Sequence, residues 1–182
     1  MAVKTFAVGE VLTASDTNTY LNNGGLVYVY SEAIGSTPVA SFTPASNVFS
    51  STYDNYRIIW QGGTCSSGGV SSRIIFGSTN IGYYGSQPYW TAAGGSGANP
   101  INNGAFLYCG SQDTGGWGLT LDVLGPYTAT YTQISGFSSG GTAVTINMGY
   151  LANTTSYTKF TISAGAGTFT GGTVTVYGYR KA

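Results

Sequence analysis

Short runs in which apolar and polar residues alternate strictly are the feature that most constrains the fold of this chain. In the run WGLTLDVL, Leu119, Leu121 and Val123 lie on one side of an extended backbone, and the polar residues between them lie on the other side. The run TAVTINMGY repeats this alternation from Val144 to Tyr150. A period of two residues indicates β-strands rather than helices.

Runs of this kind follow one another from Leu26 almost to the C-terminus. They are rich in Val, Ile, Thr, Tyr and Phe and are bounded by Gly, Ser, Asn or Pro: LVYVYS, YDNYRIIWQG, VSSRIIFG, AFLYCG, WGLTLDVLG, TATYTQISGF, TAVTINMGYL, YTKFTIS and GGTVTVYGYR. Turn signals recur roughly every 8–12 residues, and no helical pattern intervenes. We therefore expect an all-β domain over residues 25–182, folded as an antiparallel β-sandwich or jelly roll, rather than a parallel α/β sheet.

Residues 1–24 have a different pattern and are expected to form a separate attachment segment. Thr13 can cap a short helix, Asp16 would lie near its positive end, and Gly24 or Gly25 can end it. A helix of only about two and a half turns is marginal alone in water. We therefore expect this segment to dock on a partner through its few apolar residues.

The connection over residues 82–104 contains two prolines and many glycines and is expected to be a long loop. Aromatic rings stack well on the apolar faces of sugars, and this connection bunches several of them. Five aromatic residues are candidates for contact with a glycan or a host surface: Tyr83, Tyr84, Tyr89, Trp90 and Trp117. The alternative, which we favour, is that these rings fill one end of the sandwich or a subunit contact.

The residue types on which most catalytic sites depend are scarce. The chain has no histidine, which removes Ser-His-Asp and Cys-His catalysis. The run GFSSG at 136–140 matches the G-x-S-x-G nucleophile pattern, but it lies between two β runs and is interpreted as a turn. A glycosidase would need two carboxylates that meet in space, from Glu10, Asp16, Glu32, Asp54, Asp113 and Asp122. We do not expect an enzyme.

We expect no cofactor and no metal site. Cys65 and Cys109 cannot fill a zinc shell alone, and buried free thiols are the favoured interpretation, with a pairing across two neighbouring strands as the alternative. The sequence has no D-x-D-x-D loop for calcium and no glycine-rich phosphate loop. Asp54 and Arg57 lie three residues apart on an expected strand, so each should pair with another strand.

Charged residues make up only 7% of the chain, and the net charge is zero. Without a basic patch the chain is not expected to bind nucleic acid, and the scattered Lys and Arg residues provide no electrostatic membrane anchor. No signal peptide and no apolar run of ~18 residues is present, so we expect no membrane insertion. A surface with so little charge is poorly protected against association, which favours a place in an assembly.

The opening KTFAVGEVLTASDTNTYLNNGGLVYV resembles the N-termini of many structural proteins of tailed bacteriophages, of the minor tail and tail fibre kinds. The matching positions are Phe6, Gly9, Glu10, Leu12, Thr13, Ala14, Asp16, Asn18 and Leu21. The later runs YDNYRIIWQGGT, GYYG, GSQDTGGWGLTLDV and GGTVTVYGYRK resemble a β-rich group of such proteins. The resemblance therefore extends over most of the chain.

This resemblance implies a non-enzymatic virion structural protein that is assembled in the bacterial cytoplasm and is commonly trimeric. Its β-sandwich would serve as a tail appendage or fibre component, in contact with other virion proteins. Docking on the particle would use Phe6, Gly9, Glu10, Leu12, Thr13, Asp16, Asn18 and Leu21. Two alternatives remain, a capsid decoration protein that stabilises the head and a carbohydrate-binding module for host adhesion.

Overall fold

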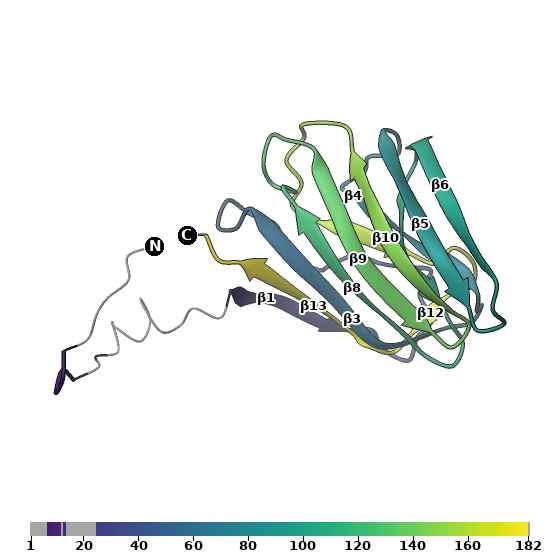
Figure 1. The fold of residues 1–182 in the computed structure, drawn as a ribbon, viewed down its shortest axis with the longest axis horizontal. Helices are drawn as coiled ribbons and strands as arrows, with labels where there is room; N and C mark the ends of the chain where they lie inside the picture. The colour runs from purple at the N-terminus through teal and green to yellow at the C-terminus, as the bar shows by residue number, and fades with distance from the viewer. Residues whose placement is uncertain (1–6, 12, 14–24, 182) are drawn as a thin grey trace.

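The computed structural model describes residues 7–11, 13 and 25–181, and its strands begin at Leu26 (Figure 1). The strands in chain order are β1 (Leu26–Ala33), β2 (Ser41–Phe42), β3 (Asn55–Cys65), β4 (Val70–Phe76), β5 (Tyr83–Thr91), β6 (Ser96–Gly104), β7 (Leu107–Gln112), β8 (Trp117–Leu124), β9 (Thr132–Gly140), β10 (Ala143–Leu151), β11 (Phe160–Ser163), β12 (Phe169–Thr170) and β13 (Thr173–Tyr179).

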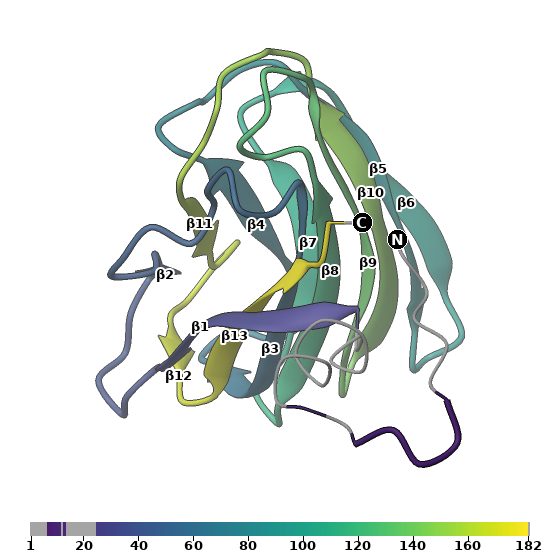
Figure 2. The same cartoon turned by 90° about the vertical axis from the view of Figure 1, so that its left-hand side faces the viewer.

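Two antiparallel sheets pack face to face, so the predicted antiparallel β-sandwich is confirmed. The larger sheet has the strand order β1-β13-β3-β8-β9-β10-β5-β6, and β12 adds to β3 beside this path. The smaller sheet has the order β2-β11-β4-β7. Figure 2 shows β2, β11 and β4 facing the long curved wall that β8, β9, β10 and β5 build.

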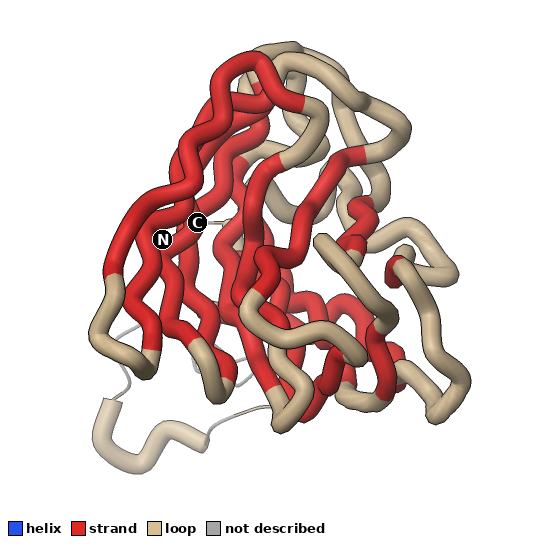
Figure 3. The backbone as a smooth tube through the Cα atoms, turned by 90° about the vertical axis from the view of Figure 1, so that its right-hand side faces the viewer, coloured by secondary structure: helices blue, strands red, loops and turns tan. Residues whose placement is uncertain are grey.

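The described part of the chain consists of strands and loops without a helix (Figure 3). The helix predicted to begin at Thr13 falls on residues outside the described part. Gly25, the first described residue of the domain, has a positive φ of 67°, a conformation that glycine adopts without strain. The boundary predicted at residues 24–25 thus directly precedes the first strand of the sandwich.

The prediction of a long loop over 82–104 is wrong, because these residues form the hairpin of β5 and β6. Two prolines concealed the strands, and the register shows how each is tolerated. Pro100 lies in β6, the edge strand, where a missing N–H breaks no inner ladder. Pro88 pairs with β6 but has no partner in the β10 ladder, which runs from Tyr89 directly to Ser86.

The run GFSSG is also corrected, because it lies inside strand β9 and is not a turn. Gly136 allows close approach, since a β-carbon there would lie 2.1 Å from the carbonyl oxygen of Thr120 on β8. Ser138 is buried and takes part in hydrogen bonds between strands. The serine is therefore structural, and no exposed nucleophile elbow is formed.

The interior beside β3 and β8 is a continuous aromatic core. The ring centroid of Trp60 lies 4.7 Å from that of Phe169 and 4.8 Å from that of Trp117. Phe42 packs edge-on against Trp60, and Phe49 packs on Tyr56. These large side chains are almost completely buried, so this part of the sandwich supplies most of the hydrophobic stabilisation.

Both cysteines are buried and unpaired, as the sequence favoured. Burial raises the pKa of the Cys109 thiol to about 12, so its reactive thiolate is suppressed. Further along the interior, Gly149 of β10 lets the side chain of Leu107 approach the sheet. A β-carbon at position 149 would lie 2.6 Å from Cδ2 of Leu107 and 2.6 Å from the carbonyl oxygen of Tyr84.

Candidate functional site

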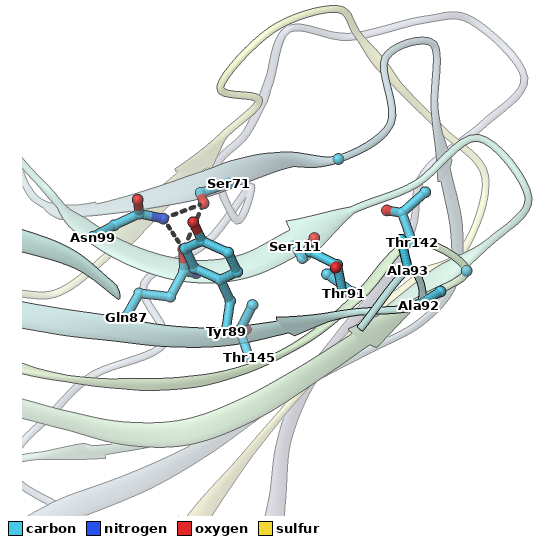
Figure 4. A pocket seen from close by; sticks show the side chains of 13 residues that line it. Ser71, Gln87, Tyr89, Thr91, Ala92, Ala93, Asn99, Ser111, Thr142 and Thr145 are labelled. Carbon is cyan, nitrogen blue, oxygen red and sulfur yellow. Dashed lines mark hydrogen bonds between the residues drawn. The ribbon is translucent and has the colours of Figure 1, made fainter. Parts of the chain in front are cut away.

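A pocket of about 590 Å³ opens between the two sheets next to the β5–β6 edge. Strands β4, β5, β6, β7 and β10 all contribute side chains to it. Figure 4 shows two groups of lining residues. One end of the pocket holds Ser71, Gln87, Tyr89 and Asn99, and the other end holds Ala92, Ala93 and Thr142. None of the described lining residues is charged.

Gln87 is the fixed centre of the pocket wall. It is fully buried, and its Nε2 donates to the carbonyl oxygen of Gly110 at 3.2 Å and to Oδ1 of Asn147 at 2.8 Å. Its Oε1 accepts from Nδ2 of Asn99 at 3.1 Å and from the hydroxyl of Ser71 (Figure 4). These four bonds fix the orientation of the amide, so Gln87 holds Asn99 and Ser71 in place at the pocket.

A second chain of hydrogen bonds continues behind the pocket. The amide N–H of Ser111 donates to Oγ of Ser138 at 2.8 Å, Ser138 and Thr145 share a bond of 2.7 Å, and Thr145 donates to Oδ1 of Asn147 at 3.2 Å. Nδ2 of Asn147 is buried and has no partner among the described residues. This end of the sandwich is therefore filled by polar groups, whereas the other end has an aromatic core.

The polar interior has a counterpart on the outside of the same strands. We call β9, β10, β5 and β6 the uncharged half of the larger sheet, because their sequences contain no charged residue, and β1, β13, β3 and β8 the charged half. The outer face of the uncharged half exposes a group of large apolar side chains: Trp90, Phe137, Val144, Ile146, Met148 and Tyr150. The alternation predicted for 143–150 is present, but its apolar side faces outward.

The register places these side chains next to one another. Val144 of β10 lies opposite Trp90 of β5, and Ile146 lies opposite Phe137 of β9. The rings of Tyr84 and Tyr131 both stack on Tyr150, at centroid distances of 5.4 and 5.9 Å. The apolar residues therefore form one continuous patch, which we call the outer apolar face.

The five aromatic residues proposed for glycan contact do not come together. Tyr83 and Trp117 are buried in the core, and the hydroxyl of Tyr83 accepts from the backbone N–H of Phe76 at 2.9 Å. Tyr84 and Trp90 lie on the outer apolar face. Only Tyr89 lines the pocket. Strand alternation separates neighbours such as Tyr89 and Trp90 onto opposite faces, which a loop would not do.

The segment proposed for docking is described only in part. Phe6, Leu12, Asp16, Asn18 and Leu21 lie outside the described residues. Gly9 and Glu10 belong to a turn in which the N–H of Glu10 donates to the carbonyl oxygen of Ala7, and the Glu10 carboxylate accepts from the N–H of Ala7, both at 3.1 Å. The flanking Val8 and Val11 are exposed. The last docking candidate, Thr13, is described but not within a regular element.

Two carboxylates at the charged half, those of Asp122 and Asp54, form ion pairs. Nε and the terminal nitrogen of Arg57 each donate to Asp122 at 2.8 Å, and the hydroxyl of Tyr179 donates to the same carboxylate at 2.6 Å. The hydrogen bonds from Arg57 hold the pKa of Asp122 below its usual range, while burial and the bond to Asp122 raise the pKa of Tyr179 to about 12. Lys181 pairs with Asp54 at 2.7 Å, so Asp54 and Arg57 bind separate partners, as predicted.

Asp113 lies near the pocket but does not line it. Its Oδ1 accepts from the N–H of Gly115 at 2.8 Å, and this bond is the main cause of its lowered pKa. Among the described residues, no three metal-ligating side chains gather at one point. The same residues contain no helix long and apolar enough to cross a membrane.

Several pocket residues were missed by reasoning from the sequence. Ser71, Gln87 and Asn99 come from three strands, and only the strand order brings them together. One signal was available, since Thr145 and Asn147 alternate with apolar residues on β10. This strand has two polar residues on one side and four apolar residues on the other, and either side can face the core. In β10 the polar side is the buried one.

Comparison with known proteins places the chain in no family. No family model matches it, and no curated protein matches it. Among solved structures, the binding domain of botulinum neurotoxin serotype D/C is similar at a TM-score of 0.22 and 10% identity, over 80% of this chain and 43% of that one. The chain thus spans less than half the length of that protein, and a likeness this low carries no argument about function.

Proposed function

We propose that the chain is a non-enzymatic structural subunit of a bacteriophage particle that assembles as a homotrimer through the outer apolar face. The observation that carries this proposal is the exposure of large apolar side chains over three adjacent strands, β9, β10 and β5, without a single charge. Phe137 is 60% exposed and Trp90 50% exposed, in the middle of a regular sheet. Patches of this kind on a folded domain mark association surfaces.

The occupant of this face is another copy of the same chain. When two identical surfaces meet, a charged residue can lie against a residue of the same charge. An uncharged face avoids this electrostatic repulsion. The neighbouring half of the sheet does carry charges on its outer side, where Arg57 and Asp122 pair within one molecule. The outer apolar face thus has the composition that self-association favours.

The shape of the face also suits self-association. A shallow groove of about 240 Å³ lies beside Phe137, lined by residues of β3, β8 and β9 that include Ile59, Gly118 and Thr120. Gly118 has no side chain, which leaves the groove open. Phe137 projects next to a hollow, and copies related by rotation can insert this ring into the groove of the neighbour.

The attachment role rests on the N-terminal turn and on the resemblance to virion proteins. Val8 lies within the turn from Ala7 to Glu10 and Val11 directly follows it, and both are apolar and exposed. Their burial in a binding site on the particle is favourable by about 25 cal/mol per Å² before the costs of association. We propose a tail appendage, with decoration of the head as the alternative location.

Self-association is tested by light scattering on the purified full chain. The Ile146→Lys variant places a charge in the centre of the outer apolar face, and we expect it to convert the trimer to monomers. The matched control is Thr173→Lys, which adds the same charge at an exposed position of the charged half and should leave the trimer intact. A wild-type chain that is monomeric at high concentration would contradict the assembly.

Location on the particle is tested by immunogold labelling of intact phages with an antibody to the chain. Label on the tail or its fibres supports the appendage, and label spread over the head supports decoration. Particles that carry no label would overturn the virion assignment, whatever the oligomeric state. Removal of residues 1–24 should abolish labelling in either location while leaving the sandwich folded.

A further inference from the structure

We propose that the pocket between the sheets binds an uncharged saccharide unit. The proposal is independent of the outer apolar face, because Gln87, Tyr89 and Thr145 point inward while Trp90, Ile146 and Met148 point outward from the same strands. The volume of the pocket, about 590 Å³, lies within the ~300–1,000 Å³ typical of small-molecule sites. The chemistry of the walls selects the ligand class.

The walls offer neutral hydrogen-bonding groups from several strands. Hydroxyl groups come from Ser71, Tyr89, Thr91, Ser111 and Thr145, and an amide group comes from Asn99. A saccharide presents several hydroxyls that both donate and accept, so it matches a set of neutral groups that also do both. A purely apolar ligand would instead bury the unbonded hydroxyls of Ser111 and Tyr89 without partners.

Two of these groups are free to bind. The side-chain hydroxyls of Ser111 and Tyr89 make no hydrogen bond within the part of the chain that the structure describes, while the backbone N–H of Ser111 is already used. Ser71 and Asn99 are held in place by their bonds to Gln87, whose own amide is fixed by two further bonds. A fixed network with free hydroxyls beside it is preorganised for a ligand, because little side-chain freedom is lost on binding.

Tyr89 supplies the apolar surface that a sugar ring needs. It lies opposite Gly97 of β6, and a β-carbon on Gly97 would stand 2.6 Å from the phenol oxygen. The glycine therefore leaves room for the tyrosine ring to lie over the edge strand at the pocket mouth. Sugar C–H groups pack against an aromatic face, as apolar groups do in other small-molecule sites.

The absence of charge among the described lining residues decides against acidic ligands. A sialic acid, a uronic acid or a phosphate would enter a partly enclosed site without a cation to compensate its charge, which is unfavourable. The nearest charged side chain named above, Asp113, is an anion whose Oδ1 accepts from Gly115. Its negative charge disfavours anionic ligands further.

The test is binding of the labelled full chain to an array of neutral and acidic glycans, followed by calorimetry with the glycans retained. We expect binding to neutral glycans only. The Tyr89→Ala and Asn99→Ala variants should each weaken it by at least about tenfold, the effect of losing one well-placed contact. Both residues are only half-buried, so neither variant should prevent folding.

The matched control is Trp90→Ala, which removes an aromatic ring one residue away on the opposite face of β5. We expect an unchanged affinity per chain in calorimetry for this variant, even where loss of the trimer weakens capture on the array. If free hexoses compete with the retained glycans at similar concentrations, the ligand is a single sugar. If only oligosaccharides bind, the ligand is a surface glycan. Both outcomes support the proposal.

Several outcomes would overturn it. They are the absence of any retained glycan at millimolar concentration, a preference for acidic glycans, or a loss of binding with Trp90→Ala but not with Tyr89→Ala. The last result would place a glycan site on the outer apolar face, where the self-association proposed above could not coexist with it. If only the proposal of glycan binding in the pocket fails, the proposed trimer and the proposed location on the virion are unaffected, because separate experiments test them.

Discussion

The two halves of the larger sheet use the same alternation of residues in opposite ways. In the charged half, β3 and β8 bury Ile58, Trp60 and Leu121 and turn Arg57 and Asp122 outward, where they pair. In the uncharged half, β10 and β5 bury polar residues and turn apolar residues outward. The charged half of this continuous sheet is therefore conventional. In the uncharged half the alternation is inverted, and we call this the inverted half below.

The difference assigns separate roles to the two halves. The charged half forms its core from aromatic rings packed at tilted and edge-to-face angles and carries an ion pair on its outside, as a stable monomer does. The inverted half gives up part of its hydrophobic stabilisation, since Gln87 and Asn147 occupy buried positions that apolar residues could fill. It gains a polar pocket on one side and an apolar face on the other, both suited to binding.

The largest expected effect tests whether stability is concentrated in the charged half. Replacing Trp60 by alanine removes a buried ring that contacts Phe42, Trp117 and Phe169, and we expect the free energy of unfolding to fall by about 3–5 kcal/mol. The matched truncation Tyr89→Ala, at a half-buried ring beside a cavity, should cost about 1 kcal/mol. Urea unfolding measured by fluorescence gives both values, and equal losses would contradict the comparison.

The next effect tests close packing at the junction between the inverted half and the smaller sheet. Gly149→Ala places a β-carbon within 2.6 Å of Leu107 and of the backbone of β5, so we expect a loss of about 1–3 kcal/mol from overpacking. The control is Gly35→Ala, where no heavy atom lies within 4 Å of the added carbon. Thermal unfolding of both variants checks this, and a neutral Gly149→Ala would mean that Leu107 and the backbone of β5 can both shift.

The sequence predicts the strands well but says little about which face of a strand is buried. Period-two patterns located the strands around Leu121 and Ile146 equally clearly. The apolar side of the first faces the core and that of the second faces outward, a choice that depends on the partner sheet and not on the strand itself. An outward apolar side becomes expected only if the protein associates.

The pocket could not be predicted for a related reason. β6 has no apolar periodicity and contains Pro100, so it does not read as a strand, although it completes the pocket edge with Asn99. The bonds from Gln87 to Ser71 and Asn147 join residues far apart in the chain, which only the strand order brings into contact. By contrast, the pairing of Asp54 and Arg57 with separate partners follows from local strand geometry.

A smaller effect concerns the ions of the charged half. The pKa of Asp122 is lowered in the folded protein by Arg57, so its stabilisation is present above the unfolded-state pKa of about 3.9 and is lost as the pH falls through the folded value. Because both side chains are partly exposed, we expect Asp122→Asn to cost about 1 kcal/mol at pH 7. The difference between wild type and variant should shrink below about pH 4.

Urea titrations of both proteins between acidic and neutral pH check this expectation. Asp113 also has a lowered pKa and remains in both proteins, so acid destabilises the variant as well, and only the difference between the curves reports on Asp122. A difference that is constant over the whole pH range would show that the loss does not depend on the charge of Asp122 and would contradict the ion-pair account.

The smallest expected effect on stability is at the outer apolar face. Phe137→Ser removes a large ring that is more than half exposed, so the free energy of unfolding of the monomer should change by no more than about 0.5 kcal/mol. Because a trimer is stabilised by mass action, the same variant should appear less stable than wild type at high protein concentration and equal to it on dilution. Unfolding midpoints measured over a dilution series separate the two contributions. A large loss that persists on dilution would mean that Phe137 supports the fold of β9 itself, and the inverted half would then owe its outward apolar residues to monomer stability rather than to assembly.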